Sequence, residues 1–144
     1  MKLYTILLII LVFTSCSQNQ RVNKSVVIDN AKIEKNKQTA LLNKVSELTT
    51  VAQRLERQGR GLESYRRASG AESLQACNNF MEDMRRETND LEANIKNLPE
   101  SYSVRLASII PDLNECVTCS KKAMNSCVKS RATINELIKE LFPQ

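Results

Sequence analysis

The chain of 144 residues contains no His and no Trp, and it has only three each of Phe, Tyr, Gly and Pro. Without His, the commonest general base and the usual catalytic triads are missing, as is the His that follows a haem-attachment motif. Scarce Gly and Pro, with many Leu, Glu, Lys, Asn and Ser, argue against a β-sandwich and favour helices. We therefore expect an all-α fold whose core has few aromatic rings.

The sequence also lacks a phosphate-binding loop, a nucleophile elbow and a calcium loop. Its 21 basic and 16 acidic residues give a net charge of +5. Basic and acidic residues are interleaved, as in the stretch from Glu82 to Glu87, which is typical of a solvated, ion-paired helix face. We expect a non-enzymatic protein with no catalytic residues, no metal, no cofactor and no nucleic-acid partner.

Residues 1–17 have the three parts of an export signal. Lys2 is the only charge, an apolar stretch from Leu3 to Phe13 follows, and small or polar residues come next. The apolar stretch is shorter than the roughly 20 residues that span a bilayer. We predict a signal peptide, so that the remaining chain carries 20 basic and 16 acidic residues and acts outside the cytosol.

Two processing events fit this signal. Ordinary cleavage after Ser17 would leave Gln18 as the new N-terminus and a secreted, extracellular protein, which is the interpretation we favour. Alternatively, Phe13-Thr14-Ser15-Cys16 resembles a bacterial lipobox, in which Cys16 becomes lipidated, although Leu is usual where Phe13 stands. In that case the protein would be anchored by lipid at the bacterial outer membrane; otherwise we expect no membrane contact.

The rest of the chain divides into a lead-in and a helical domain. Residues 18–32 show no sustained hydrophobic period, which predicts a flexible segment, and Asn23 lies there in a glycosylation sequon. Residues 33–144 carry helical apolar stripes, which predict a bundle of three to four helices. The expected helices span 33–57, 72–97, a segment from 101 that Pro111 kinks or restarts, and 127–141, with a short piece at 62–68 and a break at 58–61.

Leucines stand seven residues apart at Leu41, Leu48, Leu55 and Leu62. This spacing allows a zipper, in which two chains associate through Leu41, Leu48 and Leu55. Gly59 and Gly61 weaken the fourth heptad, and the positions between the leucines are mixed. We favour the face of an intramolecular bundle and keep self-association as an alternative.

Four cysteines remain once Cys16 has left with the signal or become an anchor, and this even count suits two disulfides in an oxidising compartment. If the helices on either side of Pro99 form an antiparallel hairpin, Cys77, which lies 22 residues before Pro99, faces position 121. Its nearest partners are then Cys119, which we prefer, and Cys116.

The remaining cysteine must reach Cys127. Cys116 and Cys127 would stand about 16 Å apart in one continuous helix, too far for a disulfide. This pairing therefore requires a turn, which we place at 121–126. The competing solution keeps the helix whole, closes Cys116 on Cys119 and joins Cys77 to Cys127.

The Cys116-Val117-Thr118-Cys119 motif has two further interpretations. A redox motif would need a βαβ context, and no strand pattern precedes it. A four-thiolate zinc site is conceivable, but an exported protein favours disulfides.

These observations favour a secreted, non-enzymatic helical binding or effector protein whose protein or small-molecule partner the sequence does not identify. The alternatives are a bacterial envelope lipoprotein, lipidated at Cys16 and acting as an accessory or exclusion factor, and an oligomerising coiled-coil protein.

Overall fold

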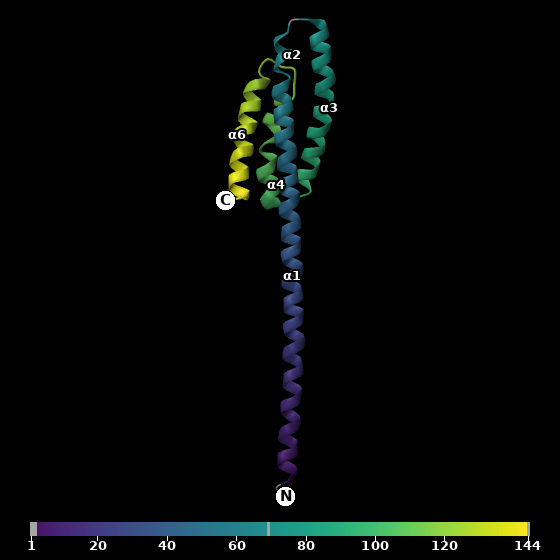
Figure 1. The fold of residues 1–144 in the computed structure, drawn as a ribbon, viewed down its shortest axis with the longest axis vertical. Coiled ribbons are helices and arrows are strands. Elements are labelled where there is room, and N and C mark those ends of the chain that lie inside the picture. The colour runs from purple at the N-terminus through teal and green to yellow at the C-terminus, as the bar shows by residue number, and fades with distance from the viewer. Residues whose placement is uncertain (1–2, 69, 144) are drawn as a thin grey trace. The chain divides into compact units, whose positions relative to one another are not determined.

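A computed structural model describes residues 3–68 and 70–143, with side chains at residue 30 and from residue 32 onward within those ranges. Helices and their connections make up this part of the chain, with no strand among its residues (Figure 1). The order is α1 (Leu3–Gly61), α2 (Glu63–Arg67), α3 (Ala71–Lys96), α4 (Glu100–Ala107), α5 (Ile110–Cys116) and α6 (Ala123–Leu141). The all-α prediction is confirmed.

The chain divides into two units, one ending at Asn43 and the other beginning at Lys44. The first unit consists of the N-terminal part of α1. The structure includes residues 18–32 in α1, and no Gly or Pro occurs before Gly59 to interrupt the helix. The flexibility that we expected for this segment stays a prediction. In the described part of the chain, no helix combines the length and apolar character needed to cross a membrane.

The second unit is a helical bundle. Figure 1 shows α3, α4 and α6 alongside the part of α1 that belongs to this unit. Aliphatic side chains from all of these elements form its core, and burying each Leu or Ile contributes about 1.5–3 kcal/mol. The fully buried set is Val45, Ala52, Leu55, Ile95, Leu106, Ile109, Leu113, Val117, Ala123 and Ile134.

Three of the heptad leucines, Leu48, Leu55 and Leu62, are buried within this bundle. They therefore serve an intramolecular face, as we favoured. Self-association through Leu41, Leu48 and Leu55 stays a prediction, and the burial of Leu48 and Leu55 opposes it, because a partner helix could reach them only if the bundle opened.

Proline sets two of the boundaries as the sequence predicted. The chain turns after α3 and Pro99 precedes α4, because a residue before proline is disfavoured in a helix. Pro111 stands in the first turn of α5, where its missing N–H costs no helical hydrogen bond. It therefore opens a new helix rather than kinking a continuous one.

Three expectations were wrong in detail. The break at 58–61 comes later, because α1 continues to Gly61. The turn between the last two helices lies at 117–122, because α5 ends at Cys116 and α6 already begins at Ala123. The helical spacing predicted for 72–97 would put Leu74 on the buried apolar stripe, but Leu74 is 57% exposed.

Candidate functional site

Two disulfides join the connection between α5 and α6 to the bundle. Cys77 of α3 bonds Cys119 (Cα–Cα 6.0 Å), and Cys116 at the end of α5 bonds Cys127 of α6 (Cα–Cα 4.6 Å). The structure thus brings together the pairs that the antiparallel count preferred, and the turn at 117–122 makes the second pair reachable. Cys116 and Cys127 are fully buried, whereas Cys119 is only partly covered.

Gly59 of α1 lies close to the end of α5. A Cβ atom at this position would lie 2.6 Å from Cys116 Sγ and 2.8 Å from the Cys116 carbonyl oxygen. Real side chains do not tolerate such distances, so only glycine lets the two helices approach. Gly61, two residues on, is different, because a Cβ atom there would have no neighbouring atom within 4 Å and would enter open space.

Arg66 of α2 holds the end of α5. Its guanidinium donates from Nη2 to the Cys116 carbonyl oxygen (2.7 Å) and from Nε and Nη2 to the Thr118 carbonyl oxygen (2.9 and 2.7 Å). The last carbonyl groups of a helix have no N–H donor within the helix, and the Arg66 side chain supplies donors in their place. The Arg66 side chain is 2% exposed, and its Nη1 lies 3.6 Å from Glu63 Oε2.

Burial and neighbouring charges shift the pKa values of Arg66 and Glu63. Burial lowers the pKa of Arg66, and the nearby Glu63 and Glu115 carboxylates offset part of that effect. A hydrogen bond from Arg67 lowers the pKa of Glu63. Because a guanidinium stays protonated at any physiological pH, Arg66 acts as a fixed charged donor rather than as a titrating group.

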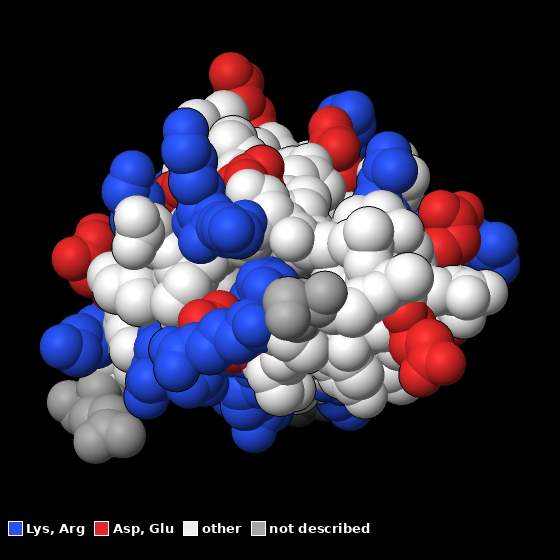
Figure 2. Space-filling view, turned by 90° about the horizontal axis from the view of Figure 1, so that it is seen from above, with Lys and Arg blue, Asp and Glu red and all other residues white. Residues whose placement is uncertain are grey.

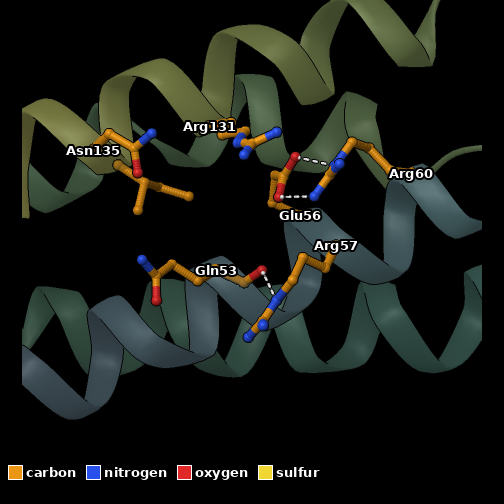
Figure 3. A pocket seen from close by; sticks show the side chains of 7 residues that line it. Gln53, Glu56, Arg57, Arg60, Arg131 and Asn135 are labelled. Atoms are coloured by element: carbon orange, nitrogen blue, oxygen red, sulfur yellow. Dashed lines mark hydrogen bonds and ion pairs between the residues drawn. The ribbon is translucent and has the colours of Figure 1, made fainter.

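A polar notch lies between α1 and α6, as Figure 3 shows. Its floor is the Glu56 carboxylate, which is 4% exposed and pairs with Arg60, with Nε 2.5 Å from Oε1 and Nη2 3.3 Å from Oε2. Its full lining is Gln53, Glu56, Arg57, Arg60, Arg131, Ile134 and Asn135.

The polar notch carries more positive than negative charge. Arg60 compensates Glu56, which leaves Arg57 and Arg131 as a surplus beside the Gln53 and Asn135 amides. Figure 2 likewise shows basic side chains gathered along one side of the end of the molecule, whereas elsewhere on that face the two signs alternate. Since the lining holds one carboxylate and no hydroxyl or thiol, the chemistry that the notch offers is ion pairing and hydrogen bonding.

A second depression lies where the end of α1 and α2 face α3. Its lining, which we call the aromatic groove, is Gln58, Gly61, Leu62, Tyr65, Phe80, Asp83, Met84 and Glu87, and its volume is about 440 Å³. Tyr65 and Phe80 form a tilted ring pair, with centroids 5.5 Å apart and 44° between the planes. The Phe80 side chain is 51% exposed.

The aromatic groove differs from the notch in charge. Asp83 and Glu87 are its only charged lining residues. Arg54 neutralises Glu87 at 2.7 Å, while Asp83 forms no ion pair with any residue in the described range. The groove is therefore apolar inside, with one uncompensated carboxylate at its edge.

Other residues singled out from the sequence lie elsewhere. Cys16 and Asn23 fall outside the residues whose side chains the structure describes. Among the described residues, no group of three or more His, Cys, Asp and Glu could hold a metal. Sequence reasoning missed Arg66, because two consecutive arginines usually both lie on the surface. It also missed the groove, because its two aromatic rings come from different helices.

Comparison with known proteins adds no assignment. No protein-family model matches the chain, and no curated protein or solved structure is significantly similar to it. The function must therefore be argued from the geometry of these surfaces.

Proposed function

We propose that this chain is exported and acts outside the cytosol as a non-enzymatic helical binding protein, with the aromatic groove as its working surface. Support for export comes from the signal at residues 1–17 and from the two disulfides, because disulfides persist mainly in oxidising compartments. Support for binding comes from the groove itself.

The observation that carries the proposal is the open ring pair of Tyr65 and Phe80. The chain has only six aromatic residues, and two of them line one concave surface instead of filling the core. Leaving an aromatic ring half in water forgoes part of the burial free energy that it could contribute. An apolar depression of about 440 Å³ is within the size range of small-ligand sites.

The framework around the groove suits binding. The Cys77–Cys119 disulfide ties α3, which carries Phe80, to the connection that follows α5. Arg66 ties α2, which carries Tyr65, to the same place. Both walls are thus fixed to one anchor, and a preformed site loses less conformational entropy when a ligand binds.

A lipoprotein is the second candidate for the same domain. The Phe13-Thr14-Ser15-Cys16 stretch would place a lipid at Cys16 and tether the domain to a membrane. Since both disulfides form among the four other cysteines, lipidation of Cys16 would leave both disulfides of the domain intact. The groove would then serve an accessory or exclusion factor of a bacterial envelope.

Mass spectrometry of the N-terminus of the protein recovered from its own cells tests the export proposal and separates the two candidates. We expect Gln18 as the first residue of a protein in the medium. A lipidated Cys16 in the membrane fraction would favour the second candidate, and Cys16→Ala should then release the protein from membranes. An unprocessed Met1 in the cytosol, with all five cysteines reduced, would refute both.

A further inference from the structure

We infer that the aromatic groove binds a small molecule with an apolar body and one cationic head, an aliphatic or aromatic amine or a quaternary ammonium. This inference rests on the proposed function and names the ligand class of the same site.

The apolar body would contact the inner surface of the groove. Leu62, Tyr65, Phe80 and Met84 provide this surface, and they come from the junction between α1 and α2, from α2 and from α3. Gly61 adds no side chain, and no atom lies within 4 Å of the place where a Cβ would be. The groove is therefore wide enough for a chain or ring to lie along it.

The charge at the edge selects the head group. Among the residues whose side chains are described, no Lys or Arg lines the groove, although the chain as a whole carries +5. Glu87 is already paired with Arg54, so Asp83 is the carboxylate that a ligand can meet. A cation beside Asp83 gains Coulomb attraction, whereas an anion is repelled, and the effect weakens as salt screens it.

The ring pair favours the same charge. A cation is attracted to an aromatic face when it lies within about 6 Å of the ring centroid. With centroids 5.5 Å apart, Tyr65 and Phe80 can both lie within this distance of one head group. The polar notch has the opposite preference, because Arg57 and Arg131 are in excess there. Probes of opposite charge should therefore separate the two surfaces.

Three probes with one apolar body and different heads test the inference: 4-phenylbutylamine, 4-phenylbutanol and 5-phenylpentanoate, each with a phenyl ring on four methylene groups. Each is titrated into the oxidised chain at low salt, and binding is followed by amide chemical shifts. We expect the amine to bind about fivefold more tightly than the alcohol, as a modest ion pair plus a cation–π contact would give. The pentanoate should bind more weakly than the alcohol, and the shifts should centre on Leu62 and Phe80.

Three variants assign the effect to the groove. Asp83→Asn should remove most of the amine's advantage over the alcohol, leave the share that the ring pair contributes, and leave the affinity for the alcohol unchanged. Phe80→Ala should weaken both by about tenfold, since a half-buried ring and its stacking contacts are lost. Asp90→Asn, which removes an exposed carboxylate of α3 outside the groove, is the matched control and should change neither.

The outcomes separate the ligand class from the function. Equal affinity for the amine and the alcohol, with shifts at the groove, would overturn the cationic class and leave the binding groove standing. Absence of binding by both would overturn the groove as a working surface. A dimer in sedimentation velocity that Phe80→Ala dissolves would show that a second copy occupies the groove, and would overturn the inference as well.

Discussion

Replacing Arg66 by Ala tests whether one buried side chain holds the end of α5 in place. The Arg66 guanidinium donates to two carbonyl oxygens, those of Cys116 and Thr118, at 2.7–2.9 Å. Because the side chain is 2% exposed, water has little access to replace it. The variant leaves both carbonyls without a charged donor, next to the two disulfides.

The expected loss of stability is about 3 kcal/mol. A hydrogen bond from a charged donor contributes roughly 1.5–3 kcal/mol, and leaving a buried acceptor without a hydrogen bond costs a similar amount. Two acceptors would exceed 3 kcal/mol, but the folded state no longer has to desolvate a guanidinium, which offsets part of the loss. Arg66→Lys should recover only a fraction, because an ammonium cannot present the same planar fork to both carbonyls.

Urea unfolding of the oxidised protein, followed by far-ultraviolet circular dichroism, measures this loss. Arg67→Ala is the control, because Arg67 is the next residue of α2, is 79% exposed and pairs only with Glu63. Its loss should stay below about 0.5 kcal/mol, as for other exposed ion pairs. If Arg66→Ala costs no more than Arg67→Ala, the carbonyl contacts do not stabilise the fold and the reasoning fails.

Two further predictions concern the same junction. Gly59→Ala should destabilise the fold by about 1–3 kcal/mol, because its Cβ would overlap Cys116. Gly61→Ala should stabilise the fold by up to about 1 kcal/mol, since alanine has the higher helix propensity and its Cβ enters open space. Thermal unfolding of both variants measures the two changes, and equal effects would contradict the close approach at Gly59. Under limiting reductant, the Cys77–Cys119 disulfide, in which Cys119 is only partly covered, should open before the fully buried Cys116–Cys127 disulfide. Alkylation and peptide mapping show the order of opening, and the reverse order would be inconsistent with this burial.

Several features followed from local pattern alone. The scarcity of Gly and Pro and the apolar stripes predicted an all-α bundle, and Pro99 and Pro111 marked where α4 and α5 begin. The preferred cysteine pairing came from counting residues outward from Pro99, which works because antiparallel helices rise equally along their length. Composition and helical geometry are properties of the chain itself, so they could be used without knowing how the helices pack.

Tertiary packing decided the rest. Leu74 has the spacing of a core residue and yet points to solvent, because the width of the buried face depends on which neighbours cover α3. Gly59 looked like a helix stop, and only its distance to Cys116 shows that it permits a close helix contact inside α1. Arg66 and Phe80 gained their roles from partners far along the chain, which hydrophobic periodicity cannot register. The sequence by itself thus determined the helices and the disulfide pairing, whereas the packing of the helices decided which surface is left open for a ligand.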